Sequence, residues 1–129
     1  MTNQTNTTSQ NTIILVGNDE RLVYLLQRYF EQTSCQLIPW GNIPSVIEMD
    51  SIQPCMIIFS TVELLESAQS LLDHTSEDEI PVLVCTSVAG EAHARELGAD
   101  ACLLHPLTYA NFKAALAGIY PLESNLSGL

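Results

Sequence analysis

The sequence predicts an α/β fold in which a doubly wound, five-stranded parallel sheet lies between two layers of helices. Two observations predict this class. Five short apolar segments alternate strictly with segments of helical spacing. The apolar segments are also continuous rather than alternating with polar residues, as expected for parallel strands covered on both faces. Right-handed crossovers between such strands place helices on both sides of the sheet.

The five predicted strands are short runs rich in Ile, Leu and Val, bounded by polar residues, Gly or Pro. They occupy residues 12–17, 35–40, 55–60, 80–86 and 101–105. In a doubly wound sheet, functional groups gather at the carboxyl ends of the strands, near the point where the strand order reverses. We therefore expect a site formed by the residues at these ends, which are Gly17, Asn18, Trp40, Ser60, Thr86, Ser87 and His105.

Helices are predicted where apolar residues recur every three or four positions. They cover residues 20–33, 44–52, 64–72, 90–97 and 108–120. Polar residues before the first of these helices are N-cap candidates, and the acidic residues beside them suit the positive end of the helix dipole.

Several details of the helices are specific enough to compare with the structure. Pro44 suits the first turn of its helix, with Val46 and Ile47 facing the core and Met49 as a further inward candidate. The polar run at residues 73–79 is expected to be a solvated loop. Gly98 ends the fourth helix. Thr108 is a candidate cap for the last helix, whose core-facing residues are predicted to be Phe112, Ala115, Leu116 and Ile119.

The length of 129 residues fits one ordinary domain. Residues 1–11 are rich in Asn, Thr, Gln and Ser, so we expect a disordered tail there, followed by the domain at 12–121. Residues 122–129 are expected to be a C-terminal tail or linker. The amino terminus lacks the basic and apolar regions of a secretory signal, which favours a cytoplasmic protein.

The charge balance excludes several classes of partner. The chain has a formal net charge of −11 and only four Lys and Arg residues. Nucleic-acid binding requires a basic face that neutralises several phosphates, and an acidic surface is repelled by anionic membranes. Basic protein surfaces are the partners that such a chain attracts.

The four cysteines are expected to be reduced thiols. They stand at residues 35, 55, 85 and 102 without a C-x-x-C pair. Three of them lie in apolar runs, where Cys acts as a small buried hydrophobe. No two Cys or His residues show zinc-ligand spacing, so we expect no metal site.

Four segments carry a resemblance to a known family. They are "ILVGNDERLVYLL", "PCMIIFS", "PVLVCTS" and "LGADACLLHPL". Together they make residues 12–120 similar to the receiver domains of two-component response regulators. The resemblance implies a flavodoxin-like three-layer sandwich. It also implies a phosphoryl transfer from a partner's histidine to an aspartate, assisted by Mg²⁺, an acidic pair, a Lys and a Ser or Thr hydroxyl.

This sequence departs from the family pattern at most of the working positions. The acceptor position falls on Ser60, the acidic pair on Gly17 and Asn18, and the lysine on His105. Asp19 and Glu20 follow the acidic-pair positions directly, so the alignment could slip by one residue there, but these acids are expected at the helix start. Thr86 keeps the hydroxyl, and Pro106 matches the family's proline, which often follows a cis peptide bond. The resemblance therefore indicates a degenerate pseudo-receiver that is not an enzyme and needs no cofactor or metal.

The resemblance also suggests where a partner binds. Receivers commonly use the face made here by residues 91–96, 101–105 and 109–120, with Glu91, Cys102, Tyr109 and Phe112 on it. Cys102 stands where the family often has an aromatic ring. We expect a protein partner, such as a kinase or an output domain, and a homodimer is a further possibility.

Alternatives remain at the strand ends. Ser60 with His105 could form a nucleophile and its base, but the sequence shows no nucleophile elbow, oxyanion loop or orienting acid. Ser60 is expected to fill the pocket and to hydrogen-bond nearby backbone. His105 could replace the lysine as a pH-sensitive cation, but an uncharged, partly buried ring beside Pro106 is expected. In a second functional class, the turn at Gly17-Asn18 before a helix could bind a nucleotide or another small anionic ligand. Trp40 is either a partner contact or a cap on the edge of the core.

Overall fold

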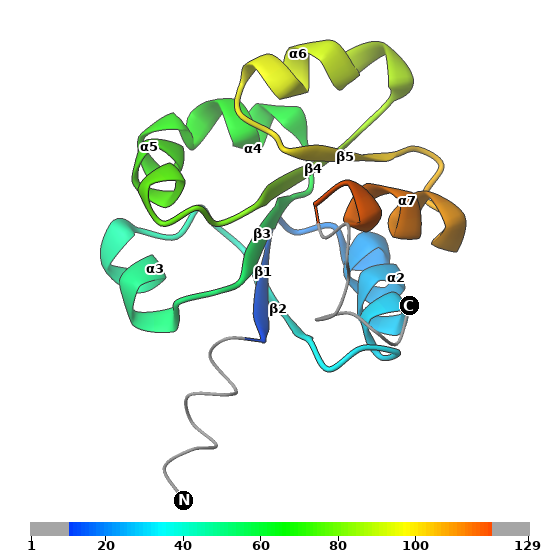
Figure 1. The fold of residues 1–129 in the computed structure, drawn as a ribbon, viewed down its shortest axis with the longest axis horizontal. Coiled ribbons are helices and arrows are strands. Elements are labelled where there is room, and N and C mark those ends of the chain that lie inside the picture. Colours follow the sequence, from blue (N-terminus) through cyan, green and yellow to red (C-terminus); the bar gives the residue numbers. More distant parts are fainter. Residues whose placement is uncertain (1–10, 120–129) are drawn as a thin grey trace, which may run out of the picture.

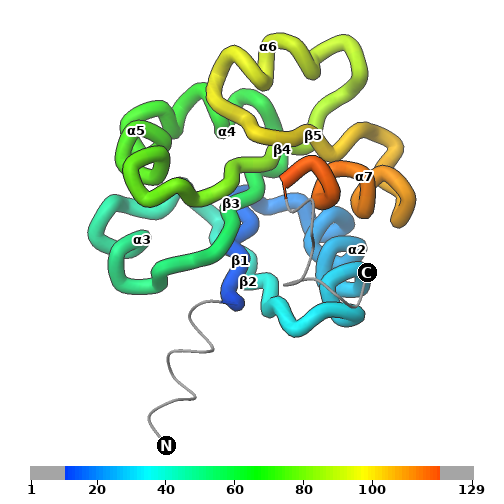
Figure 2. Tube along the Cα trace, in the orientation of Figure 1, coloured from blue at the N-terminus to red at the C-terminus, as the bar shows by residue number. Residues whose placement is uncertain are grey.

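The computed structural model describes residues 11–119, which form five parallel strands joined by helices (Figures 1 and 2). This confirms the predicted fold class. Both predicted tails, apart from Asn11, lie outside the described residues. No helix in the described range is long and apolar enough to cross a membrane. In chain order the elements are β1 (Thr12–Val16), α2 (Glu20–Phe30), β2 (Gln36–Trp40), α3 (Val46–Ile52), β3 (Met56–Phe59), α4 (Val62–Ser67), α5 (Gln69–Glu77), β4 (Val82–Thr86), the 3-10 turn η1 (Val88–Gly90), α6 (Glu91–Glu96), β5 (Ala101–Leu104) and α7 (Tyr109–Ile119).

The sheet has the strand order β2-β1-β3-β4-β5, and every pair of neighbours is parallel. The order therefore reverses at β1, which lies between β2 and β3. Val16 is in register with Phe59, and the Ser60 amide donates to the Val16 carbonyl over 3.0 Å. The residues that follow these strands, Gly17 and Ser60, consequently lie side by side at the switch point where such folds place their sites.

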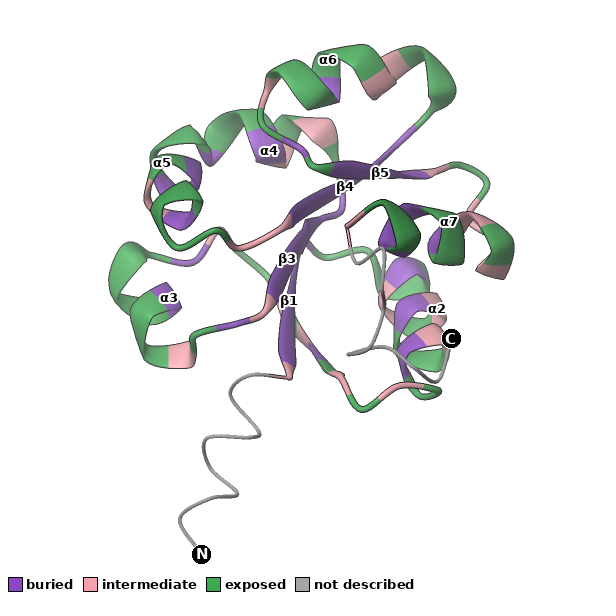
Figure 3. Cartoon of the chain, in the orientation of Figure 1, coloured by how far each residue is buried: buried purple, intermediate pink, exposed green. Residues whose placement is uncertain are grey.

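The helices form two layers, one on each face of the sheet (Figure 1). Helices α2 and α7 cover one face, and α3 to α6 cover the other. Each face of the sheet packs against its helix layer in a separate hydrophobic core. Successive side chains of β1 enter these two cores alternately, because neighbouring residues of a strand point to opposite faces. Ile13 packs with α2 and α7, and Ile14 packs with the other layer. Figure 3 shows buried residues along the strands and at positions within the helices that cover them.

An aromatic cluster joins α2 to α7. The rings of Phe30 and Phe112 meet edge to face with their centroids 4.9 Å apart. Tyr29 lies 5.3 Å from Tyr109 and 5.2 Å from Phe112. Each such pair contributes about 0.5–1.5 kcal/mol beyond its burial, so the cluster fixes the position of α7 on the sheet.

Helix α5 corrects the prediction for residues 73–79. The expected loop is helical through Glu77, and only the last residues of the run leave the helix. Thr75 continues the buried stripe of Leu71 and Leu72, is 1% exposed, and donates its hydroxyl hydrogen to the Leu72 carbonyl. The acidic residues around it occupy the solvent face. The helix predicted at residues 64–72 is also interrupted. It is divided at Ala68, where α4 ends and α5 begins.

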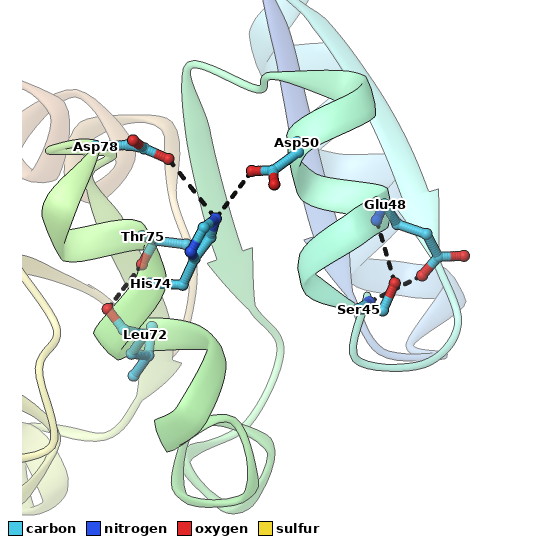
Figure 4. Close-up of polar contacts among 7 residues, drawn as sticks. All are labelled: Ser45, Glu48, Asp50, Leu72, His74, Thr75 and Asp78. Atoms are coloured by element: carbon cyan, nitrogen blue, oxygen red, sulfur yellow. Dashed lines mark hydrogen bonds and ion pairs between the residues drawn. The ribbon is translucent and has the colours of Figure 1, made fainter.

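Helix α3 begins later than predicted. Ser45 is its N-cap, and it forms a capping box with Glu48, so Pro44 precedes the helix instead of lying in its first turn (Figure 4). Because α3 begins at Val46, the side chains of its first two residues point toward solvent. Val46 is 39% exposed and Ile47 is 79% exposed, so the prediction that they face the core was wrong, and Met49 alone is buried.

Candidate functional site

The structure brings the predicted pocket residues to the carboxyl edge of the sheet. Thr86 is the last residue of β4, and the other residues lie on the loops that follow β1, β3 and β5. Gly17, Ser60 and Thr86 are buried, whereas the remaining three residues are exposed at the rim. The rim residues are Asn18, His105 and Pro106.

Gly17 and Ser60 are in direct contact at the bottom of the candidate pocket. Gly17 has φ of +130°, a conformation that side-chain-bearing residues rarely adopt. A β-carbon at this position would overlap the Ser60 hydroxyl and also approach the Leu64 side chain at 3.3 Å. The Ser60 side chain therefore uses the space that a larger residue at position 17 would need.

Asp19 is a charged residue of this edge that the sequence reasoning did not place in the pocket. It was expected at the helix start, and it is the N-cap of α2, where its Oδ1 accepts the Leu22 amide hydrogen at 3.1 Å. The negative charge of its carboxylate also affects the Cys85 thiol near the end of β4. Burial raises the pKa of the Cys85 thiol to about 12, and the charge of Asp19 adds to that effect.

The residues of the edge do not fit a Mg²⁺ site of the kind that the family resemblance implies. Mg²⁺ requires oxygen ligands in near-octahedral geometry and is usually held by carboxylates. The carboxylates found here, Asp19 and Glu20, belong to the start of α2: Asp19 caps the helix through its Oδ1 atom, and Glu20 lies in the first turn. The Asn18 oxygen lies beside Gly41, next to the end of β2, where a β-carbon would be 3.0 Å away from it. Ser60 supplies a neutral hydroxyl in place of an anion.

His105 is the residue of this edge that directly follows β5. Its amide donates to the Thr86 carbonyl at 3.0 Å, and a cis peptide bond joins it to Pro106, as the resemblance suggests. The expectation of a partly buried ring was wrong: His105 follows an edge strand and is exposed. An imidazole in solvent is not held against the buried Ser60 hydroxyl, so the geometry gives no support to a nucleophile–base pair.

Two of the four residues predicted on the interaction face are buried. Phe112 is 0% exposed because it belongs to the aromatic cluster with α2, and Cys102 is 7% exposed within β5. For Phe112, the helical spacing predicted a core position, which is confirmed, and its assignment to the interaction face was wrong. Cys102 packs with the core on the α3–α6 side, as its apolar run predicted, and it also lines a hollow on the predicted face. Tyr109 and Glu91 are half-buried and remain on the surface.

The predicted face nevertheless contains a hollow of about 320 Å³ between α6 and α7, over the edge strand β5. Arg95 crosses one side of it, with its guanidinium 3.4 Å from the Glu91 carboxylate and 3.1 Å from the Asp100 carbonyl. Small residues of α7, including Ala114 and Gly118, line the other side. Cys102 lies among the lining residues.

A second hollow of about 500 Å³ lies at the β1–β2 side of the same edge. It is lined by Gly17, Asn18, Glu20, Val23, Pro39 and Gly41. Trp40 is half-buried against the core on the α3–α6 side, which favours its role as a cap on the edge of that core. A larger hollow, of about 650 Å³, borders Val82 and Gly98 at the opposite, amino-terminal edge.

Cys35 and Cys55 form a thiol pair that the sequence spacing did not indicate. They precede β2 and β3, the two strands that flank β1, and both pack against the core under α2 and α7. A hydrogen bond from Cys55 lowers the pKa of the Cys35 thiol to about 7, and the same bond raises the pKa of Cys55. Cys85 and Cys102 are buried, as predicted, whereas Cys55 was also predicted to be buried but is half-buried because it precedes β3.

A polar cluster away from the pocket joins α3 to the end of α5 (Figure 4). His74 lies between Asp50, at 2.8 Å, and Asp78, at 3.9 Å. The hydrogen bond to Asp50 is the main reason why the pKa of His74 is raised above its ordinary value. The surroundings of this ring therefore favour positive charge.

The sequence matches no protein-family profile and no curated protein. Its fold is similar to that of solved receiver domains. The bacteriophytochrome response regulator RtBRR has a TM-score of 0.64 and 23% identity, over 85% of this chain and 78% of that one. The Pseudomonas aeruginosa PAO1 receiver domain of sensor histidine kinase PA1611, described with magnesium in its active-site cleft, has a TM-score of 0.66 and 15% identity, over 84% and 95%.

The Vibrio cholerae chemotaxis protein CheY4 gives a TM-score of 0.65 at 13% identity, over 83% of this chain and 96% of that one. These likenesses establish that the chain has the receiver fold. Because the identities are low, the function has to be argued from the residues of the site.

Proposed function

We propose that this chain is a receiver-like module that is not phosphorylated and acts in two-component-type signalling by binding a protein partner. One observation carries the proposal. At the switch point of the sheet, Gly17 and Ser60 lie side by side where the family resemblance places an acidic residue and the phosphoryl acceptor. Neither residue has a carboxylate.

The chemistry of the edge supports an inert pocket. A serine hydroxyl of ordinary pKa is a poor nucleophile unless a base activates it, and the exposed His105 is not positioned to do so. A phosphoryl group brought to Ser60 would also lack the acidic pair that holds a cation in the family, because Gly17 and Asn18 stand at those positions. The pocket therefore retains the fold of a phosphoacceptor site without its reactive groups.

The hollow between α6 and α7 is the surface that we assign to the partner. It lies on the face that the resemblance suggests, and small side chains from α7 leave it open. Arg95 and Glu91 form its polar rim, and the net charge of −11 favours a basic partner surface. In this function the domain would present one constant conformation or be controlled by its partner.

Phosphoryl inertness can be tested with a small phosphodonor. The protein is incubated with acetyl phosphate and Mg²⁺, and its intact mass is measured beside a conventional receiver domain as a positive control. We expect the conventional domain to gain a phosphoryl group and this chain to remain unmodified. A stoichiometric phosphoryl adduct on this chain would overturn the proposal, and peptide mapping would then identify the acceptor.

The binding face can be tested with a matched pair of substitutions on α7. Ala114 lines the hollow, whereas Ala117 is exposed on the same helix outside it. We expect Ala114→Trp to fill the hollow and abolish capture of the native partner from the host, while Ala117→Trp leaves capture unchanged. Equal capture by the two variants would remove the hollow from the proposal.

A second candidate function is favoured by the 500 Å³ hollow at Gly17 and Asn18, which could hold a small ligand or nucleotide. Two charges oppose an anion there, because Asp19 occupies the start of α2 and Glu20 lines the hollow. A melting temperature that rises in a panel of nucleotides and flavins would favour this candidate over the binding module.

A further inference from the structure

Two carboxylates converge on a single ring nitrogen at the ends of α3 and α5. The Nε2 atom of His74 is 2.8 Å from Oδ1 of Asp50 and 3.9 Å from Oδ2 of Asp78 (Figure 4). One N–H group at Nε2 can be donated well to Asp50, but 3.9 Å is too long for a hydrogen bond to Asp78. A hydrogen bond thus explains why Asp50 lies against the His74 ring, but it does not explain why Asp78 lies near the same nitrogen.

The other imidazole with two acidic neighbours has a different arrangement. His93 faces Glu66 with its Nε2 atom at 3.2 Å and Glu96 with its Nδ1 atom at 3.9 Å. Because those two carboxylates lie at opposite nitrogens, they cannot share one ion with the ring. At His74, by contrast, the three donor atoms all lie within 4.8 Å of one another.

We propose that Asp50, His74 and Asp78 form a binding site for a divalent transition-metal ion, with Zn²⁺ as the best match. Tetrahedral Zn²⁺ accepts imidazole nitrogen and carboxylate oxygen ligands at about 2.0–2.2 Å, which places the donor atoms about 3.3 Å apart. The present separations of 2.8 and 3.9 Å bracket that value. Small rotations of two exposed Asp side chains would bring all three donors to one ion.

The chemistry of the donors selects the class of ion. One nitrogen and two oxygens suit Zn²⁺ and similar transition metals, whereas Mg²⁺ and Ca²⁺ prefer sets made of oxygen alone. A hollow of about 370 Å³, lined in part by Asp50 and Asp78, adjoins the cluster. It leaves room for a water molecule as the fourth ligand, which an open three-residue site requires.

The positions of the ligands in the fold also favour a cation. His74 and Asp78 are four residues apart at the end of α5, so they project from one face of the helix. Asp50 lies in the last turn of α3. Carbonyl groups at the ends of both helices give this region a negative potential, which stabilises a positive ion. The bound metal would tie α3 to α5 at the sheet edge opposite the receiver pocket.

The proposal can be tested by titrating Zn²⁺ into the reduced protein in a calorimeter. We expect one saturable site whose affinity falls at least tenfold in His74→Gln, because even the loss of a group that only orients a ligand costs about 10–100-fold. Asp50→Asn and Asp78→Asn should weaken binding in the same direction. His93→Gln is the matched control, and it should bind as the unaltered protein does.

Two further measurements separate this site from other zinc ligands. In nitrogen-detected spectra of the three histidines, Zn²⁺ should shift the Nε2 signal of His74 and leave His93 and His105 unchanged. Zinc binding should also survive the double substitution Cys35→Ser and Cys55→Ser. Unchanged affinity in His74→Gln, or loss of binding in the cysteine double variant, would overturn the assignment.

Discussion

The Ser60 hydroxyl fills the space in which a β-carbon on Gly17 would lie. The two residues follow neighbouring strands at the switch point, so this contact forms the floor of the candidate pocket. It means that a side chain cannot be added at residue 17 alone without displacing Ser60. A substitution at residue 17 therefore changes the stability of the fold and the position of the Ser60 side chain together.

Substituting Gly17 should destabilise the protein. Gly17→Ala places a β-carbon against Ser60 in a backbone of φ +130°, and we expect the free energy of unfolding to fall by about 1–3 kcal/mol. Urea denaturation measures this change, with Asn18→Ala as the exposed neighbouring control. The double variant Gly17→Ala with Ser60→Gly should recover part of the loss, because it removes the contact but keeps the backbone strain. Equal stability of Gly17→Ala and the unaltered protein would contradict this explanation.

Asp19 should behave as a helix cap rather than as a metal ligand. Asp19→Ala removes the acceptor for the Leu22 amide and should cost about 1 kcal/mol of unfolding free energy. Asp19→Ser should retain most of the stability, since Ser also caps helices. Millimolar Mg²⁺ should leave the melting temperature of all three proteins unchanged. A Mg²⁺-dependent rise that Asp19→Ser abolishes would instead assign Asp19 to a cation site.

Phe112 should contribute to folding rather than to partner binding. Truncation in Phe112→Ala leaves a cavity between α2 and α7 and should cost about 3–5 kcal/mol. Tyr109→Phe keeps the ring contacts with Tyr29 and should be nearly neutral in the same denaturation experiment. If Phe112→Ala kept the stability of the unaltered protein, the central role of the aromatic cluster in docking α7 would be refuted.

Cys35 should be the most readily alkylated of the four thiols near neutral pH. Its pKa of about 7 makes the thiolate the main form above that pH, whereas burial raises the pKa of Cys85 to about 12. Iodoacetamide labelling followed by peptide mass spectrometry should give a rate for Cys35 that rises through pH 7. In Cys55→Ala the hydrogen bond is lost, so the midpoint should move to higher pH. A midpoint for Cys35 near 9 in the unaltered protein would contradict the shared hydrogen bond.

The order of the elements and the location of the pocket could be predicted from the sequence because they depend on local patterns. Continuous apolar runs indicate strands buried on both faces, and parallel strands bring their polar ends to one edge. Ser60 and Thr86 were therefore placed correctly at strand ends, and the cis bond before Pro106 agrees with what the family resemblance implies. The errors within helices have local causes too, since the Ser45 cap moved the start of α3 and the buried Thr75 extended α5.

Tertiary structure decided which distant side chains meet. Cys35 pairs with Cys55 because β2 and β3 flank β1, and Asp50 meets His74, 24 residues away, because α3 and α5 cover the same face of the sheet. Periodicity predicted that Phe112 faces the core, and the packing of α7 on α2 decided that its neighbour there is Phe30. Periodicity specifies the face of an element that is buried, but the neighbour on that face depends on strand order and helix packing, which only the folded chain defines.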